Sequence, residues 1–278
     1  MTQQLDLVCI GGGNMASAIL LGASDRGALD VARVGVVDPD EDKRRMFAGR
    51  GFQTAGSVAE LADGINDQTQ VMLAVKPQVL PEVSGSVREA IGAFARPVVW
   101  SILAGVPSGV VRERCGGSAA VVRLMPNTPA RIGKGATALA LGEGAAPGDD
   151  SFAQRVFGAI GEVFSIEERQ MDAFTAVAGS GPAYFFAMVE ALAAAAERAG
   201  LDGQVASGAA IRTAIGAMAL LEESGQSPRE LREAVTSRGG TTAAGLGALS
   251  EGGFAEVVDR AVEAARDRGF ELGRASTG

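Results

Sequence analysis

Two glycine-rich segments carry residue types that bind anionic groups. The first, Gly11-Gly12-Gly13-Asn14-Met15-Ala16, follows a short apolar run (5–10) and precedes a helical pattern. Gly11 allows a tight reversal, Gly13 lets the backbone approach a pyrophosphate, and Ala16 keeps the new helix close to the sheet. The helix N-terminus then faces the phosphates. The spacing predicts a dinucleotide-binding turn, although a glycine-rich turn between any strand and helix has the same pattern.

The second segment, Ser237-Arg238-Gly239-Gly240-Thr241-Thr242, precedes a helical run that starts at Ala243. Two glycines, an arginine and several hydroxyls at a helix start form a nest of backbone N–H groups suited to an anion such as a carboxylate. Helix capping by Thr241 or Thr242 would explain the threonines but not the paired glycines. The segment therefore predicts a carboxylate-binding site.

Asp38 ends the second predicted strand, 25 residues after Gly13. An acid at about this position accepts the adenosine ribose hydroxyls of NADH. The following bases, Lys43, Arg44 and Arg45, could instead bind the 2′-phosphate of NADPH. The choice between NADH and NADPH stays open, with Asp38 favouring NADH. We expect Asp40 and Glu41 to cap the next helix.

Three more predicted strands end in segments that could meet a ligand: 74–78, 101–106 and 125–130. Ligands of doubly wound folds bind at the carboxyl edge of the sheet. Lys76 is the only lysine expected near that edge, so a contact with the cofactor is favoured over a solvent-exposed position. The other two segments could wall the nicotinamide. The candidate cofactor-binding residues are Gly11, Gly13, Asn14, Met15, Ala16, Asp38, Ala74, Val75, Lys76, Pro77, Ala104 and Asn127.

The chain contains no histidine, and its lysines are Lys43, Lys76 and Lys134 alone. These absences exclude Ser-His and Cys-His nucleophile pairs. After Lys134, arginine is the only basic side chain, and it is a poor proton donor because its pKa lies above about 12. Cys9 and Cys115 lack metal-binding spacing, so we expect two reduced core residues and no metal site.

The charge balance, 33 acidic against 25 basic residues, gives a net charge of −8. This balance argues against a nucleic-acid partner, which needs a basic face. The first residues lack the charged and apolar regions of a signal peptide, and Glu190 interrupts the longest apolar stretch, 183–196. We expect a cytoplasmic protein with no membrane partner.

The first part of the chain alternates strand and helix signals, which is typical of a doubly wound sheet. After 163–166 only Ala- and Leu-rich helical runs follow. The sequence therefore predicts an α/β protein: a Rossmann-type doubly wound sheet over 1–166 and an all-α C-terminal dimerisation domain over 167–278. The expected strands are 5–10, 34–37, 71–75, 98–100, 120–122, 137–141 and 163–166, and the expected helices of this part include 41–50 and 81–94.

The second part predicts about five helices. The run 206–221 places Ile211, Ile215 and Met218 at helical spacing and has small residues on much of its remaining surface. A helix that is apolar on most sides must be buried on most sides. We therefore expect an intertwined homo-oligomer, most simply a homodimer; a monomeric Ala-rich bundle is the alternative.

Five motifs along the chain resemble the pyrroline-5-carboxylate reductase family. They are IGGGNMASAI (10–19), LAVKPQ (73–78), RLMPNTPA (123–130), AVAGSGPAYFF (176–186) and VTSRGGTTAAGL (235–246). The last two motifs are the most specific. The chain departs from the family pattern at Arg238, where proline is usual, and at Ser57 and Ala234, where asparagine is frequent.

The resemblance implies NAD(P)H-dependent reduction of Δ1-pyrroline-5-carboxylate to L-proline, the last step of proline biosynthesis. It further implies that Thr242, with the backbone near Gly240 and Thr241, holds the substrate carboxylate and ring nitrogen. Ser237 would lie nearby, and Glu168 falls where the family has a glutamate in its site. Thr242 and Ser237 are the candidate catalytic residues. Tyr184 is a less favoured proton donor, because a tyrosine in an apolar helix is more often a core residue.

Hydride transfer to a C=N bond suits a site without histidine, because an imine is basic enough to be protonated from water. A β-hydroxyacid dehydrogenase resembles this organisation but uses a lysine from the helical part, and none follows Lys134. A broader imine reductase is a second alternative, and the carboxylate nest favours an amino-acid-like substrate over it. A non-catalytic NAD(P)-sensing dimer is the alternative of another class.

Overall fold

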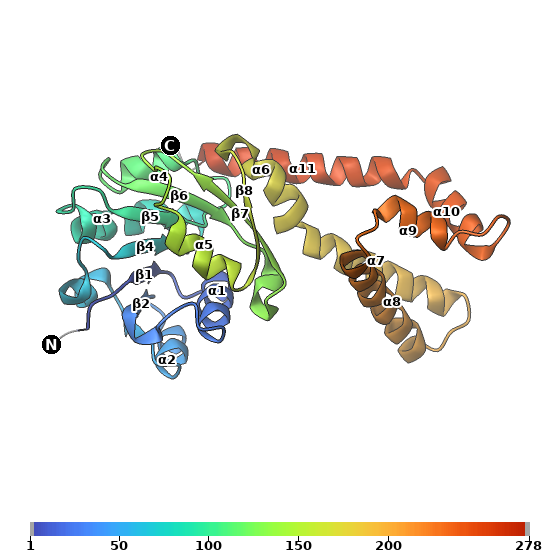
Figure 1. The fold of residues 1–278 in the computed structure, drawn as a ribbon, viewed down its shortest axis with the longest axis horizontal. Coiled ribbons are helices and arrows are strands. Elements are labelled where there is room, and N and C mark those ends of the chain that lie inside the picture. The colour runs from blue at the N-terminus through green and yellow to red at the C-terminus, as the bar shows by residue number, and fades with distance from the viewer. Residues whose placement is uncertain (1–2, 276–278) are drawn as a thin grey trace. The chain divides into compact units, whose positions relative to one another are not determined.

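The computed structural model describes residues 3–275 and divides the chain into two compact units (Figure 1). Unit 1 comprises the residues up to Ser180 together with those from Ala264 onward, and unit 2 comprises Gly181–Glu263. The sequence placed the boundary at 166, where the sheet ends. The compact unit continues beyond that point because Met171 is buried against Ala138 and Ala140 of the sheet, with Phe174 packed beside them.

Unit 1 is built on one eight-stranded sheet in the order β3-β2-β1-β4-β5-β6-β7-β8. Neighbouring strands are parallel except β6 and β7, which are antiparallel. Continuous apolar runs form the central strands, as expected for a sheet that is buried on both faces. The strands are β1 (Leu7–Ile10), β2 (Val34–Val37), β3 (Gln53–Ala55), β4 (Gln70–Leu73), β5 (Val98–Ser101), β6 (Ala120–Met125), β7 (Gly135–Leu141) and β8 (Gly161–Ser165).

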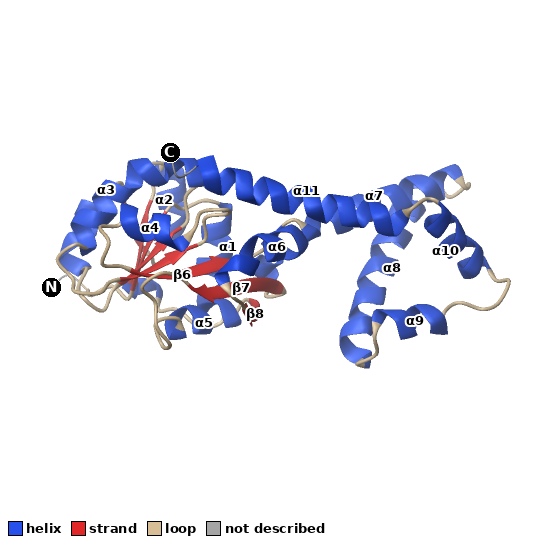
Figure 2. Cartoon of the chain, turned by 90° about the horizontal axis from the view of Figure 1, so that it is seen from above, coloured by secondary structure: helices blue, strands red, loops and turns tan. Residues whose placement is uncertain are grey.

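Helices cover both faces of this sheet (Figure 2). Leu7 and Cys9 face a core formed with α1 (Asn14–Ser24), α2 (Glu41–Ala48) and α5 (Ser151–Gly158). The alternate residues Val8 and Ile10 face a second core, because successive strand residues point to opposite faces. That second core includes α3 (Leu80–Ile91) and α4 (Ser108–Arg114).

Several expectations from the sequence are confirmed in unit 1. The predicted helices 41–50 and 81–94 correspond to α2 and α3. Asp40 caps α2 by accepting the N–H groups of Asp42 and Lys43. Both cysteines are free and buried, and burial raises the pKa of the Cys115 thiol to about 11. The sequence did not predict β3, which has only three residues and lacks an apolar run.

Unit 2 is helical, as predicted. Its residues form α7 (Gly181–Arg198), α8 (Gly203–Ser224), α9 (Pro228–Ala234) and α10 (Thr241–Glu251), together with the start of α11 (Phe254–Ala275). Large apolar side chains are exposed on these helices in the single chain, among them Phe185, Phe186, Ile211, Ile215 and Met218. Tyr184, for which the sequence favoured a core position, is 36% exposed in the single chain.

Two helical stretches, Glu168–Arg198 and Gly203–Ser224, are long and apolar enough to cross a membrane by length and composition alone. Only 11% of each apolar window is buried within the chain. A helix that is buried between subunits also needs an apolar surface. Large exposed apolar patches on soluble proteins mark such association sites.

Candidate functional site

Six parallel strands end at one edge of the sheet in unit 1: β1, β2, β3, β4, β5 and β6. The residues that follow these strands therefore lie along the same edge, where ligands of doubly wound folds bind. This edge brings together the candidate cofactor residues from the sequence. They are Gly11, Gly13, Asn14, Met15, Ala16, Asp38, Ala74, Val75, Lys76, Pro77, Ala104 and Asn127.

The first glycine turn has the backbone geometry that its sequence predicts. Gly11 has φ +103°, and a Cβ atom there would lie 2.8 Å from the carbonyl oxygen of Ala74. Only glycine is compatible with both conditions. A Cβ atom at Gly13 would meet no atom within 4 Å, so the backbone here is open to a ligand. Helix α1 starts at Asn14 without a side-chain cap, and Asn14 is exposed. The residues present therefore fit a pyrophosphate.

The buried carboxylate of Asp38 joins this turn to the end of β2. It accepts the N–H of Gly12 at 2.7 Å and the N–H of Asp40 at 2.9 Å, and Lys43 Nζ lies 3.2 Å away. Burial opposes ionisation, but these donors outweigh it and hold the pKa of Asp38 below its ordinary value. Asp38 thus holds the glycine turn against the end of β2.

The segments after β4 and β5 differ in how far they are exposed. Lys76 is exposed, and Pro77 starts a short 3₁₀ helix directly after it. Ala104 is partly exposed, whereas its neighbours Leu103 and Gly105 are buried. Lys76 and Ala104 are thus accessible to a ligand at the carboxyl edge.

The side chain of Asn127 forms hydrogen bonds within the fold. Asn127 is 7% exposed, donates from Nδ2 to the carbonyl of Ala178 at 3.0 Å, and accepts the N–H of Ala136 at 2.9 Å. Ala178 belongs to a single π-helical turn, Thr175–Gly179, of the kind that frequently marks functional sites. Asn127 therefore ties the end of β6 to β7 and to this turn, where the sequence expected a cofactor contact.

The carboxylate of Glu168 also forms its contacts within unit 1. Its carboxylate accepts the N–H of Ser108 at 2.7 Å and the hydroxyl of the same residue, and it pairs with Arg123 at 3.1 Å. Ser108 is the first residue of α4, so Glu168 caps that helix. Arg123 is only 6% exposed. These contacts use the carboxylate that the family resemblance assigned to substrate.

Glu168, Arg123 and Asp172 form one cluster of charged side chains. The sequence did not identify Arg123 or Asp172. Burial raises the pKa of Asp172, and nearby Glu168 also raises it, against the attraction of Arg123. The available signal was the single arginine inside the apolar strand β6, because a buried arginine needs a carboxylate partner. The sequence did not show which carboxylates supply it.

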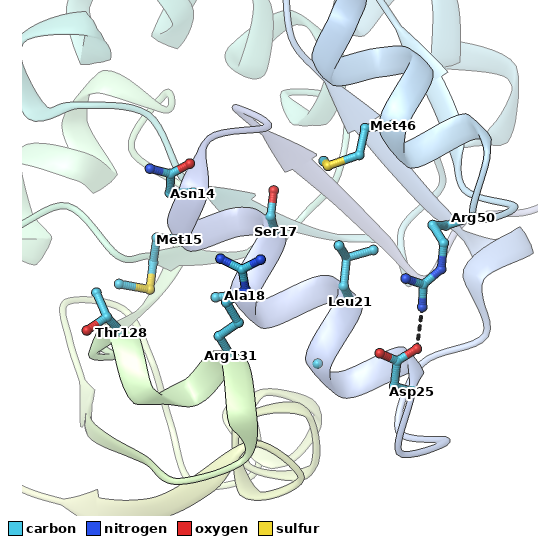
Figure 3. Close-up of a pocket in the computed structure, with 11 residues that line it drawn as sticks. Asn14, Met15, Ser17, Ala18, Leu21, Asp25, Met46, Arg50, Thr128 and Arg131 are labelled. Atoms are coloured by element: carbon cyan, nitrogen blue, oxygen red, sulfur yellow. Dashed lines mark hydrogen bonds and ion pairs between the residues drawn. The ribbon is translucent and has the colours of Figure 1, made fainter. Parts of the chain in front are cut away.

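A cavity of about 650 Å³ runs along α1 (Figure 3). Its walls are mostly apolar, with an ion pair between Arg50 and Asp25 and the guanidinium of Arg131 at its margin. The cavity borders the start of α1 and so extends from the predicted cofactor turn. The lining residues are Asn14, Met15, Ser17, Ala18, Leu21, Gly22, Asp25, Met46, Arg50, Thr128 and Arg131.

The second glycine segment lies in unit 2 and forms a tight turn before α10. Gly239 has φ +73°, and the N–H of Gly240 donates to the carbonyl of Ser237 at 3.0 Å. No side chain caps α10, so capping by Thr241 or Thr242 does not explain the threonines. Ser237, Thr241 and Thr242 are exposed. The turn thus presents uncapped N–H groups and hydroxyls to a ligand.

The described residues contain no group of three or more His, Cys, Asp or Glu side chains placed to hold a metal ion. The accessible groups are a nucleotide-compatible sheet edge in unit 1 and an anion-compatible helix start in unit 2. Together these groups suit orientation and electrostatic stabilisation of small ligands.

Comparisons with known proteins match both parts of the chain. Residues 168–272 match the model of the pyrroline-5-carboxylate reductase dimerisation family, and residues 6–105 match that of the NADP oxidoreductase, coenzyme F420-dependent family. The chain is 38% identical over 270 residues to pyrroline-5-carboxylate reductase of Synechocystis, covering 97% of this chain and 99% of the relative.

Solved structures agree with this match. A pyrroline-5-carboxylate reductase from Coxiella burnetii superposes with a TM-score of 0.87 at 33% identity, covering 97% of this chain and 99% of that one. A pyrroline carboxylate reductase from Plasmodium falciparum with NADP bound gives a TM-score of 0.84 at 26% identity, covering 98% and 100%. The likeness therefore extends over both units.

The Glu168 cluster predicts a large loss of stability on truncation. Glu168→Ala leaves the buried guanidinium of Arg123 without its ion-pair partner and α4 without its cap, so we expect a loss of roughly 3 kcal/mol in the free energy of unfolding. Denaturant unfolding measures this change. Arg169→Ala is the matched control, because it removes an exposed ion pair with Glu167 and leaves the helix caps in place. Equal effects of the two substitutions would contradict the assignment.

Asp38 predicts a pH-dependent contribution to stability. Since its pKa in the folded chain lies below its ordinary value of 3.8, the ionised carboxylate stabilises the fold above that pH. The stabilisation is lost as pH falls through the lower, folded value. We expect Asp38→Asn to cost about 1.5–3 kcal/mol near neutral pH and progressively less below about pH 4. Unfolding of both proteins across this range tests the trend, and a constant difference would refute it.

Proposed function

The chain belongs to the pyrroline-5-carboxylate reductase family, and on that premise we propose how its residues act in the reaction. The enzyme is an NAD(P)H-dependent oxidoreductase that reduces Δ1-pyrroline-5-carboxylate to L-proline. The nicotinamide, when bound, supplies a hydride to the carbon of the C=N bond. The protein supplies orientation, charge complementarity and exclusion of competing reactions.

The uncapped start of α10 is the observation that carries the substrate assignment. Backbone N–H groups near Gly240 and Thr241 hold the substrate carboxylate, assisted by the positive end of the helix dipole. The Thr242 hydroxyl holds the ring nitrogen, with Ser237 beside it. Arg238 adds positive charge to the same turn. No histidine or lysine is required, because the imine takes its proton from water.

In unit 1, the turn from Gly11 to Ala16 binds the pyrophosphate and Lys76 contacts the ribose or phosphates. The segments that contain Ala104 and Asn127 border the nicotinamide through their backbone, since the Asn127 amide is bound within the fold. We assign Glu168 a positioning role, because its carboxylate caps α4 and pairs with Arg123. In these roles the side chains of Asn127 and Glu168 keep the hydrogen bonds and the ion pair that they form within unit 1.

The enzyme is a homo-oligomer, and we propose a dimer as its unit of assembly. The exposed apolar side chains of α7 and α8 support this, because a second copy can bury them. Neither nucleic acid nor membrane is a partner. A biosynthetic enzyme with a small polar substrate also fits a cytoplasmic location.

Substrate and site are tested together by steady-state rates. We expect oxidation of NAD(P)H with Δ1-pyrroline-5-carboxylate and far slower oxidation with uncharged pyrroline, which lacks the carboxylate. Thr242→Ala should lower kcat/KM by about 100-fold, because it removes a donor at the reacting group. Ser250→Ala, at the other end of α10, is the control. An unchanged rate for Thr242→Ala would refute the assignment.

We also propose that Asp38 favours NADH. Its partner Lys43 is 42% exposed and can move aside, which frees the carboxylate for the ribose hydroxyls. Asp38→Asn should therefore raise KM for NADH about tenfold more than KM for NADPH, the value of one hydrogen bond to a charged group. Asp40→Asn, which alters a helix cap in the same segment, should affect both equally. Equal effects of Asp38→Asn on both cofactors would contradict the proposal.

A further inference from the structure

The C-terminal turns of α11 pack closely against the loop after β5, and the shortest approaches are between backbone atoms. A Cβ atom at Gly273 would lie 2.1 Å from the carbonyl oxygen of Gly105, and one at Gly105 would lie 2.5 Å from that of Gly269. Gly105 also has φ +76°. All three glycines are buried, and all belong to unit 1. The contact leaves no space for a methyl group on either side.

The spacing of four residues places Gly269 and Gly273 on one face of α11. Phe270 and Glu271, between them, are exposed. At Gly273 the loop comes so close that no residue with a Cβ atom fits without a shift, whereas at Gly269 the loop approaches the carbonyl oxygen. Asp172 lies against Gly269 from the other direction, 3.2 Å from where its Cβ would be.

The loop that α11 contacts is fixed at both of its ends. The N–H of Ile102 donates to Leu73 of β4 at 3.2 Å, and Glu168 caps Ser108 where α4 begins. Leu103 and Val106 are buried in the core. Between these anchors, α11 is the support beneath Gly105, and Ala104 is the partly exposed residue directly before it.

We propose that the end of α11 sets the position of the 102–107 loop through Gly105, Gly269 and Gly273, and thereby the wall against which the nicotinamide lies. The inference rests on the proposed function, which places Ala104 beside the nicotinamide. The part of α11 that makes this contact, from Ala264 onward, belongs to unit 1. Gly105, Gly269 and Gly273 are positioning residues.

Gly273→Ala tests the contact directly. The new methyl group must displace the Gly105 carbonyl by about 1 Å, and a displacement of that size can cost about 100-fold in rate. We expect kcat to fall by roughly 10- to 100-fold. NADPH should still bind, measured by energy transfer from Trp100, the single tryptophan of the chain. The primary isotope effect on kcat with NADPH deuterated at the transferred position should rise, because hydride transfer becomes rate-limiting.

Gly85→Ala is the matched control, since Gly85 lies within α3 and a Cβ atom there would meet nothing within 4 Å. It should leave kcat, the isotope effect and Tm without loss. Gly269→Ala distinguishes a general effect on the packing of α11 from an effect on the loop position. A Cβ atom at Gly269 would contact Asp172 and not the loop. If Gly269→Ala and Gly273→Ala lower Tm alike and leave kcat and the isotope effect unchanged, the contact is only structural and the proposal fails.

A measurement on the unaltered enzyme covers the case in which Gly273→Ala does not fold. Hydrogen exchange with and without NADP⁺ should show protection of the 102–106 amides and, through the glycine contact, of those at 269–273. Protection of the loop without any change in α11 would overturn the proposal. Since this measurement needs no turnover, its outcome is independent of whether Δ1-pyrroline-5-carboxylate is the substrate.

Discussion

The carboxyl edge of the sheet depends on backbone contacts that leave no room for a side chain. Gly11 approaches the Ala74 carbonyl in this way, and Gly105 approaches the end of α11. Such contacts fix the distance between two backbone segments sterically. Because the glycines have no side chain, a change of rotamer cannot absorb a displacement of either segment. The glycine turn and the 102–107 loop are therefore held in place without a ligand, which lowers the cost of orienting any reactants bound there.

The polar side chains at this edge reinforce the same geometry. Asp38 holds the glycine turn, Asn127 holds the π-helical turn, and Glu168 holds the start of α4. Each of these residue types binds ligands in many proteins, yet here each satisfies donors of its own fold. The groups left accessible at this edge are mainly backbone N–H groups and Lys76, and unit 2 separately presents the hydroxyls of the α10 turn. A site of this kind favours hydride transfer to an imine, which requires orientation and charge complementarity more than a tuned acid.

Local signals in the sequence predicted the elements that local physics determines. The apolar run before Gly11, the cap at Asp40 and the glycine pair at 239–240 all correspond to features of the structure. The three-residue strand β3 is defined by its pairing with β2, and the antiparallel direction of β7 by its pairing with β6, so neither follows from the residues of the strand itself. The partners of Glu168 lie 45 and 60 residues away, so no local pattern could identify them. Composition predicted apolar helices in the second part of the chain, but it did not show which of their side chains the single chain leaves exposed.

Transfer of isotope is the most direct test of the central claim, that this chain delivers hydride to the C=N bond of a carboxylate-bearing cyclic imine. The purified enzyme would be supplied with Δ1-pyrroline-5-carboxylate and NADPH or NADH deuterated at the transferred position, and the product analysed by mass spectrometry. We predict L-proline that carries one deuterium on the former imine carbon, formed by the unaltered enzyme and strongly reduced with Thr242→Ala. Proline without deuterium, or no proline with either cofactor, would contradict the account.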